Sequence, residues 1–458
     1  MKKDFSKVFT SNLVKMMATI VATFFLPKIL AVDEYAYIKL YQLWSSYIGL
    51  FALGFNDGVF LKYGGQALET HLKEIGDEHI TFLVYQLGIT FVALLFSILS
   101  NRFYLAVWAF SILPVNLFTY YIYMYQATGR FDAYSRIVNI NSFLVFFSDF
   151  VLLFIFKIRD YKAFISLYCI SNYVVFVYGL LAFDLRFHVK RGKLRLKVLF
   201  SNMTSGVLLM IGNLAYIFFV SLDRWFSKGF LGLKAFAEYS FSGQLLTVIN
   251  MFITPLSLTL YSYFVRAKDH QFELEIRQSL SVILMGMLII VYPINFVIAH
   301  FISKYTESIP VISTLFMSQI YLTLNTSIFV NLYKVYQRTK TYFIILASIC
   351  ALSVGMNFIG FFALHNNLGF ALATFICMVV WTIANMNSFP YLKYRRKEVI
   401  YIVLLTILYF SLVKAPAIIG FFSYGIGYFA LSLLVTRKSF IRALRFLLPA
   451  RFFNGSVK

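Results

Sequence analysis

The residues of this sequence that could do chemistry are the few ionisable side chains inside long apolar runs. Asp149 stands in SFLVFFSDFVLLF, about twelve residues into a span that begins near Ile137, which places a helical aspartate roughly 18 Å from the nearer membrane surface. A short carboxylate cannot reach water from that depth, so a neighbouring helix or a bound proton must compensate its charge. Asp149 is therefore either a structural hydrogen-bonding group or a site for a proton or another cation.

Lys15 is the deepest basic residue of the first apolar run, about seven residues and roughly 10 Å from its start. Its long stem could carry the ammonium back to the interface. However, Asn12, Lys15, Thr19 and Thr23 are spaced so that they form one polar stripe on an otherwise apolar helix. Such a stripe is typical of a helix that lines a hydrated cleft.

Two further lysines lie near the ends of apolar runs. Lys28 follows Pro27, and Lys39 lies in the next run. Because both are close to the expected outer interface, extension of each ammonium to that interface is one interpretation. The other is that Lys28 and Lys39 join Lys15 in a cationic cavity.

Asp223 and Arg224 stand side by side in VSLDRWFSKGF, at the expected outer end of a span. Adjacent helical residues point in different directions, so the two need not form a simple ion pair. One interpretation is an interfacial anchor assisted by Trp225. The alternative is direct function, with Arg224 contacting a substrate and Asp223 joining Asp149 as an ion-coupling candidate.

Other kinds of site have no signature in the sequence. It contains no G-x-x-x-x-G-K-[ST] motif, no H-E-x-x-H motif and no serine-nucleophile elbow. Cys169, Cys350 and Cys377 are too scattered for a zinc cluster. We therefore expect no catalytic residues, no metal site and no cofactor, and we expect that the protein is not an enzyme. Its basic residues are dispersed over short loops, which argues against nucleic acid as a partner.

The elements that must position these side chains are transmembrane helices. Of the 458 residues 60% are hydrophobic and only 13% are charged, whereas soluble domains have about 25% charged residues. Apolar runs of about 20 residues recur along the whole length, enough to cross a bilayer as a helix. Since the loops between them are short, any function must take place within the membrane.

Scanning for these runs predicts an all-α polytopic membrane protein with about fourteen spans. They begin near Val8, Ala36, Ile80, Phe103, Ile137, Ala163, Val198, Ala235, Ser279, Ile309, Tyr342, Leu368, Val399 and Ala417. The last two are expected to form a hairpin at Pro416. The longest inward loop is expected at residues 57–79.

The basic stretch DLRFHVKRGKLRLK divides the predicted spans into two halves. We expect an N-terminal lobe at 1–190, a C-terminal lobe at 191–390, and a terminal helix pair with a basic tail at 391–458. With both termini cytoplasmic, the inward segments carry about three times as many Lys and Arg as the outward loops, as the positive-inside rule requires. The halves are then parallel repeats.

Four stretches, in order over most of the chain, resemble bacterial polysaccharide transporters of the O-antigen flippase type. They are LPKILAVDEYAYIKLYQL, LFALGFNDGVFLKYGG, SLDRWFSKGFLGLKAFAEYSFSGQLL and YKVYQRTKTYFIILASICALSVGMNFIGFFALHNNLGFALAT. That family belongs to the multidrug/oligosaccharidyl-lipid/polysaccharide exporter superfamily. The resemblance implies two parallel six-helix lobes around a central cavity that opens alternately to each side of the bacterial inner membrane.

The same resemblance implies the cargo, which is an oligosaccharide repeat unit on polyprenyl pyrophosphate, turned from the cytoplasmic to the outer leaflet. Lys15, Lys28, Lys39 and Arg224 are the candidate cavity cations for the pyrophosphate, and Asp149 and Asp223 are the candidates for coupling to a proton or sodium ion. Relatives often have arginine in the cavity, whereas lysine provides a point charge without bidentate geometry. Membrane lipids and other polysaccharide-assembly proteins are further expected partners.

Two other functions stay open at this point. The same fold could export a drug or toxin in exchange for an ion, although a carboxylate-rich cavity would suit a cationic drug better than lysines do. A polysaccharide polymerase is the third reading. Such an enzyme would be expected to have a large outward loop with arginines, which the sequence does not contain.

Overall fold

The computed structural model describes residues 22–66, 71–187 and 192–447, and these residues form helices joined by short turns, with no strand among them. Nine of the described helices are long and apolar enough to cross a membrane. The predicted class, an all-α multi-pass membrane protein, is confirmed. Each predicted span from Ala36 onward begins inside a helix of the structure. The count of about fourteen stays a prediction, because the first span falls mostly outside the described residues.

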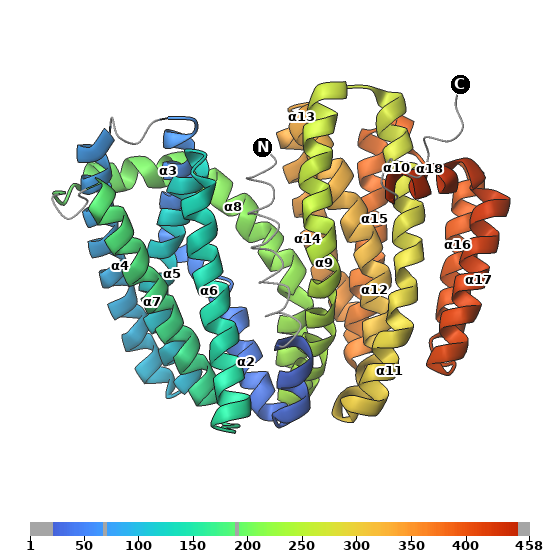
Figure 1. The fold of residues 1–458 in the computed structure, drawn as a ribbon, viewed down its shortest axis with the longest axis horizontal. Helices are drawn as coiled ribbons and strands as arrows, with labels where there is room; N and C mark the ends of the chain where they lie inside the picture. Colours follow the sequence, from blue (N-terminus) through green and yellow to red (C-terminus); the bar gives the residue numbers. More distant parts are fainter. Residues whose placement is uncertain (1–21, 67–70, 188–191, 448–458) are drawn as a thin grey trace. The chain divides into compact units, whose positions relative to one another are not determined.

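The chain forms two compact units, residues 1–221 and 222–458 (Figure 1). The predicted lobe boundaries at residues 190 and 390 stay a prediction. In the first unit a helical segment at 22–29 precedes the other elements. These are α2 (Val32–Ser45), η1 (Ile48–Ala52), α3 (Phe55–Tyr63), α4 (Leu72–Ser100), α5 (Phe103–Ala127), α6 (Phe131–Phe150), η3 (Val151–Ile155), α7 (Tyr161–Phe187) and α8 (Leu196–Phe226), whose last residues belong to the second unit.

Helix α5 is the centre of the first unit, in contact with α2, α3, α4, α6 and α7. Two thirds of its apolar window (67%) is buried, against 28% for α4. Its core is aromatic, with Phe55 and Phe82 stacked at 4.2 Å between ring centroids and Tyr120 packed beside both. Buried rings fill this core, while the exposed apolar faces of the outer helices suit a lipid environment.

The long inward loop expected at residues 57–79 is mostly helical, and that prediction is wrong. Helix α3 continues to Tyr63 and α4 already begins at Leu72. The charged residues of this stretch suggested a loop. Within this stretch Lys62 pairs with Glu74 and Glu78, and Asp77 pairs with Arg195 outside it, so the helices continue through these charges.

The second unit contains the remaining elements. They are η5 (Ser227–Leu231), α9 (Leu233–Ala267), α10 (His270–Met287), η6 (Leu288–Ile290), α11 (Val291–Phe301), η7 (Ser303–Ser308), α12 (Ile309–Leu324), η8 (Asn325–Phe329), α13 (Val330–Val335), α14 (Thr339–Leu364), α15 (Asn367–Ser388), η9 (Pro390–Leu392), α16 (Arg396–Leu412), α17 (Ala417–Val435) and α18 (Arg437–Leu447). Its most buried helix is α12, which packs on α9, α10, α11 and α15.

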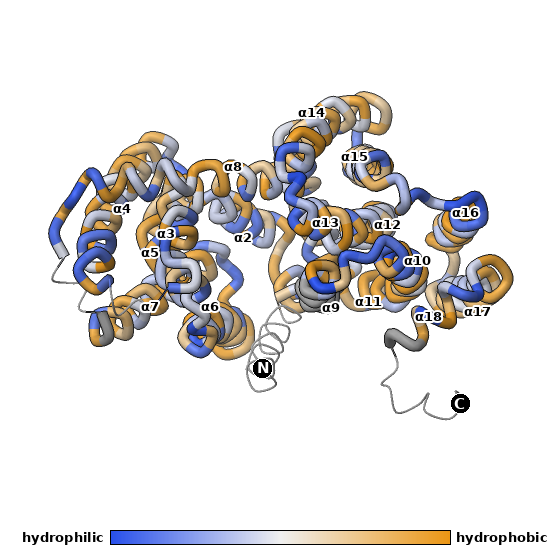
Figure 2. Tube along the Cα trace, turned by 90° about the horizontal axis from the view of Figure 1, so that it is seen from above, coloured by the Kyte–Doolittle hydropathy of each residue, from blue (hydrophilic) through white to orange (hydrophobic). Residues whose placement is uncertain are grey.

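Helices α14 and α15 form a tightly packed pair at the edge of this unit. A Cβ on Gly369 would lie 2.2 Å from the carbonyl oxygen of Gly360, so the two backbones are in direct contact. Small residues at such crossings allow the close packing that membrane helices depend on. The rest of α14 is apolar, as its colour in Figure 2 shows, and only 22% of its apolar window is buried.

The terminal helices α16 and α17 form the predicted hairpin and are fastened to the rest of the second unit by polar contacts. The Tyr409 hydroxyl donates to the Ser313 carbonyl at 2.9 Å, and the Tyr424 hydroxyl donates to the Met285 carbonyl at 2.8 Å. Near one end of α10, Arg277 pairs with Glu398 of α16 at 2.8 Å. These contacts make the terminal pair an integral part of its unit.

Candidate functional site

Asp149 lies at the end of α6 with 1% of its surface exposed. The Tyr168 hydroxyl of α7 donates a hydrogen bond to its carboxylate at 2.5 Å. Tyr168 is itself buried and could not be recognised from the sequence, because it lies 19 positions along the chain on another helix. A charge-assisted bond of this kind is among the stronger ones available to a buried carboxylate.

Lys39 of α2 is the cation that acts on Asp149. The Lys39 side chain is buried, with 6% exposed, and its charge interacts electrostatically with that carboxylate. Its Nζ donates to Gln42 Oε1 at 2.9 Å and lies 5.1 Å from the ring centroid of Tyr35. The interpretation that Lys39 extends to the interface is therefore not supported. The fold brings together Lys39 and Asp149, which the sequence suggested separately.

A polar layer continues from this pair through the interior of the first unit. Tyr41 of α2 shares a hydrogen bond of 2.8 Å with Ser111 of α5, and its ring lies beside that of Tyr168 at 6.4 Å. On the other side of Asp149, Ser148 and Ser171 link α6 to α7 at 3.4 Å. Asp149 therefore lies in a cluster of hydroxyl-bearing side chains that come from α2, α5, α6 and α7.

The other two predicted lysines differ from Lys39 in their position. Lys28 lies in the helical segment at 22–29 and its side chain is exposed. Lys15 lies outside the described residues. The structure therefore leaves a three-lysine cavity untested.

Asp223 of α8 is buried, with 7% exposed, and is surrounded by donors from three helices. Tyr239 of α9 donates to Oδ2 at 2.5 Å, and Thr374 of α15 donates to the same oxygen at 3.3 Å. The backbone N–H of Arg224 donates to Oδ1 at 2.8 Å. The expected role as an interfacial anchor does not describe this environment, because the carboxylate ties three helices together.

Arg224 runs alongside α9 rather than toward a separate site. A Cβ placed on Gly243 would come within 3.2 Å of its guanidinium, so the glycine leaves room for it. The charge also acts on the neighbouring Asp223. Only part of the Arg224 side chain is covered, which leaves the second cation candidate partly accessible.

Both buried aspartates are followed by a short π-helical segment. Val151–Ile155 begins directly after α6, and Ser227–Leu231 directly after α8. Wide turns of this kind are rare and occur often at functional sites. In both units the backbone therefore departs from regular helix within a turn of the carboxylate.

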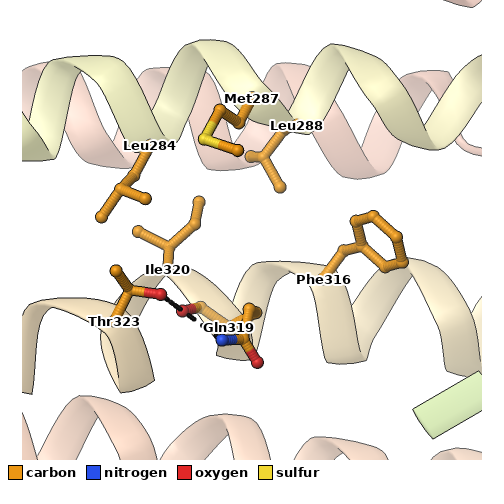
Figure 3. Close-up of a pocket in the computed structure, with 7 residues that line it drawn as sticks. All are labelled: Leu284, Met287, Leu288, Phe316, Gln319, Ile320 and Thr323. Atoms are coloured by element: carbon orange, nitrogen blue, oxygen red, sulfur yellow. Dashed lines mark hydrogen bonds between the residues drawn. The ribbon is translucent and has the colours of Figure 1, made fainter. Parts of the chain in front are cut away.

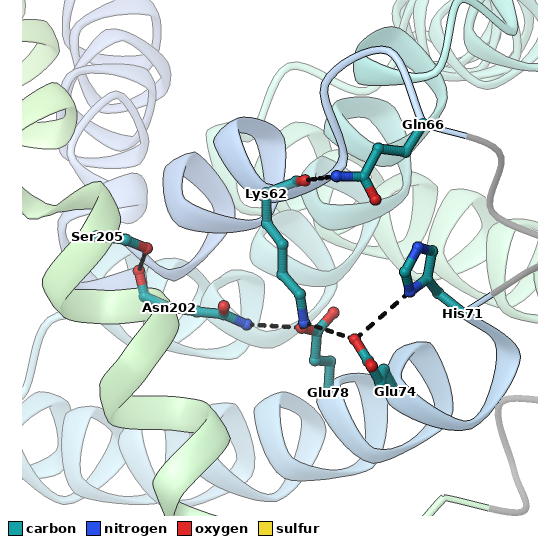
Figure 4. Close-up of polar contacts among 7 residues, drawn as sticks. All are labelled: Lys62, Gln66, His71, Glu74, Glu78, Asn202 and Ser205. Carbon is teal, nitrogen blue, oxygen red and sulfur yellow. Dashed lines mark hydrogen bonds and ion pairs between the residues drawn. The ribbon is translucent and has the colours of Figure 1, made fainter.

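One group of ion pairs that the sequence analysis missed lies around the first turns of α4, at one end of the first unit (Figure 4). Lys62 of α3 contacts Glu78 at 2.8 Å and Glu74 at 3.1 Å, both on α4. Asn202 of α8 donates to Glu78 at 3.1 Å, and Glu78 is completely buried. This network fastens three helices.

Helices α3 and α8 are also held together by close contact between their backbones. A Cβ on Gly58 would lie 2.0 Å from the Asn202 carbonyl, and one on Gly206 would lie 2.0 Å from the Gly54 carbonyl. Helices α3 and α8 therefore cross without room for side chains. We assign this end of the unit a structural role.

The small cavity in Figure 3 lies in the second unit between α10 and α12, next to Gln319 and Thr323. Gln319 also donates to Asn250 of α9 at 2.6 Å. The cavity volume is about 10 Å³, which is about the space of one water molecule. It cannot hold a transported molecule. Within the described ranges, no three His, Cys, Asp or Glu side chains are grouped so as to bind a metal.

Comparison with solved structures identifies the fold. The chain superposes on the lipid II flippase MurJ in an inward closed conformation with a TM-score of 0.68 and 13% identity, over 96% of this chain and 99% of that one. An inward-facing multidrug resistance MATE family transporter of the MOP superfamily gives 0.53 and 11%, over 83% and 95%. The Vibrio cholerae MATE transporter VcmN gives 0.50 and 13%, over 86% and 98%. No protein-family model and no curated protein matches the sequence.

At these identities the likeness concerns the fold alone. The fold of the predicted exporter superfamily, with its two helical lobes, is confirmed. The comparison includes both a lipid flippase and drug exporters, so it does not distinguish between their cargoes. That choice depends on the residues of this chain.

Proposed function

We propose that this protein is a flippase that moves a polyprenyl-pyrophosphate-linked oligosaccharide from the cytoplasmic to the outer leaflet of the bacterial inner membrane. The observation that carries the proposal is a buried cation, Lys39, whose charge acts on the buried carboxylate of Asp149, within a fold of this superfamily. The comparisons show the fold, and the class of cargo is our proposal.

Lys39 suits a pyrophosphate because a bond to an anion is stronger than its contacts with the neutral groups of Gln42 and Tyr35. It has a neutral hydrogen-bond acceptor in Gln42 and a ring face in Tyr35, and a dianionic phosphate would attract the ammonium more strongly than either. When Lys39 turns to the phosphate, Asp149 loses its compensating charge. Uptake of a proton by Asp149 then removes the buried charge and couples cargo binding to proton movement.

In this mechanism the two lobes, residues 1–190 and 191–390, rock against each other to expose the cargo to either side of the membrane in turn. Lys15 and Arg224 provide further positive charge along the path, and Asp223 is the second candidate for coupling to a proton or sodium ion. Both termini face the cytoplasm. Enzymes that assemble the repeat unit supply the cargo and are the natural functional partners.

The test is to delete the gene in its host and measure which leaflet holds the lipid-linked oligosaccharide. Accumulation on the cytoplasmic face, reversed by the wild-type gene and not by Lys39→Gln, is the expected result. Lys28→Gln is the matched control, since it removes an exposed lysine. Normal transfer to the outer leaflet in the deletion strain, with no other flippase present, would show the proposal to be wrong.

The second candidate is an ion-coupled exporter of drugs or toxins. It is favoured by the buried carboxylate of Asp149, a group able to exchange a proton for a cationic drug, and by a fold that MATE transporters share. A deletion strain with unchanged polysaccharide and raised sensitivity to cationic drugs would select this function. Polymerase activity is the third and weakest candidate, tested by incorporation of labelled sugar by the purified protein.

A further inference from the structure

A cavity in the first unit has neither Lys39 nor Asp149 in its wall. It has a volume of about 690 Å³ and opens where α4 ends and where α5 and α7 begin. This is the end of α4 opposite to the Lys62 ion pairs, and the topology from the positive-inside rule makes it the outer end. Sites for small molecules commonly measure about 300–1,000 Å³, so the cavity can hold a group of one or two sugar rings.

Four aromatic rings form the wall of this cavity. Tyr37 of α2 and Tyr161 of α7 are stacked with centroids 4.5 Å apart, and Tyr104 of α5 lies 5.9 Å from Tyr37. Phe103 meets Tyr161 edge-on at 6.4 Å. Three helices thus contribute rings to one wall, where the apolar faces of sugars can pack and hydroxyl groups are at hand.

Two cations stand at the mouth of the cavity. Arg102 Nη1 donates to the Tyr104 hydroxyl at 3.3 Å, and Lys162 Nζ lies 5.8 Å from the ring centroid of Phe103. Both side chains are exposed, and neither forms an ion pair with a carboxylate of the described residues. Two positive charges are therefore available to an anionic ligand at this rim.

Two acids, Glu34 and Asp160, lie near the cavity, and each is bonded to a backbone N–H. Glu34 accepts the backbone N–H of Tyr161 at 2.5 Å, and Asp160 accepts the backbone N–H of Lys162 at 2.8 Å. Neither acid is part of the cavity wall. The wall contains Ser97 and Asn101 as further polar groups, and Asn101 ends α4 in the left-handed conformation with φ 49°.

We propose that this cavity, lined by Tyr37, Tyr161, Arg102 and Lys162, binds an acidic sugar group, a uronate or a sugar phosphate, on the outer side of the membrane. The stacked rings accept the sugar face and the cations accept its charge. This assignment rests on the proposed translocation of a saccharide cargo, and it gives the first unit an exit site for the leading sugars. It implies that the cargo carries an acidic residue.

The test is a binding titration with the purified full-length protein in phosphatidylcholine nanodiscs, followed by saturation-transfer NMR. The probes are a glucuronate-containing disaccharide and its neutral glucose counterpart. We expect the acidic disaccharide to bind more tightly, and Arg102→Gln with Lys162→Gln to weaken it by about tenfold or more. The control variant, Lys157→Gln with Arg159→Gln, removes two cations from the link between η3 and α7. Neither residue lines the cavity, so binding should be unchanged.

Equal affinity for the two sugars, or equal loss in the two double variants, would overturn the proposal. Binding that is seen in phosphatidylcholine but abolished in phosphatidylglycerol nanodiscs would identify the cavity as a lipid headgroup site and would overturn it too. The titration needs no translocation. Failure here with a positive leaflet assay therefore rejects the exit site alone, whereas binding with a negative leaflet assay rejects only the flippase function.

Discussion

The two units each contain a buried aspartate bonded to a tyrosine of the next helix, at the same distance of 2.5 Å, but the surroundings of the two pairs differ. In the second unit Asp223 receives two further hydrogen bonds, from Thr374 and from the Arg224 backbone. In the first unit Asp149 has Tyr168 and the charge of Lys39, which comes from a third helix.

This difference indicates that a buried carboxylate has two possible roles, joining helices or exchanging an ion. A carboxylate with several fixed donors joins the helices that carry those donors. A carboxylate whose charge is offset by a lysine can lose that compensation when the lysine turns to a better ligand. Asp223 is therefore the more structural of the two, and Asp149 the better candidate for a working ion site.

The largest effect on stability is expected from Asp223→Ala. The change leaves the Tyr239 and Thr374 donors buried without an acceptor, which should lower the free energy of unfolding by about 2 kcal/mol. Thermal unfolding of the purified protein measures it, with Asp223→Asn as the control that keeps an acceptor. A larger loss for Asp149→Ala would reverse the assignment of roles.

The largest effect on transport with the fold intact is expected from Asp149→Asn. The amide keeps an acceptor for Tyr168 but cannot exchange a proton, so the transfer rate should fall about tenfold or more. Leaflet accessibility of the lipid-linked oligosaccharide measures the rate, and Asp223→Asn should reduce it less. Full activity of the Asp149→Asn variant would remove Asp149 from the mechanism.

A smaller effect separates the two tyrosines. Tyr168→Phe removes the one hydrogen bond recorded for Asp149 and should lower stability by about 1 kcal/mol. Tyr239→Phe should lower it less, because Thr374 and the Arg224 N–H still satisfy Asp223. Paired denaturation curves test this order, and equal losses would mean that the extra donors contribute nothing.

The smallest effect is expected at Lys28. Because its side chain is exposed, Lys28→Gln should leave the unfolding temperature unchanged, whereas Lys39→Gln removes a charge from the interior near Asp149. Comparing the same two variants in the leaflet assay shows whether the buried lysine is needed for transfer and the exposed one is not. An equal loss of transfer would place Lys28 on the cargo path as well.

The amino-acid sequence was sufficient for the class and for the positions of the helices. Apolar runs of membrane-spanning length are a local property, so every predicted span from Ala36 to Ala417 begins in a helix. Proline and a short polar link were enough to place the terminal hairpin. The sequence also identified Asp149 as a candidate site, because its position within an apolar span predicts its depth in the membrane, and burying a charge at that depth is costly.

Tertiary structure alone decided which side chains meet. Lys39 faces Asp149 from a helix 110 positions away, and the burial of Glu78 depends on Lys62 and Asn202 from two other helices. Likewise the outer cavity unites residues from α2, α4, α5 and α7. Periodicity tells which face of a helix is polar, but the neighbour that covers this face is set by the packing of all helices together. Charges that look alike in the sequence therefore became an exposed lysine at 28, a buried cation at 39 and an ion pair at 62.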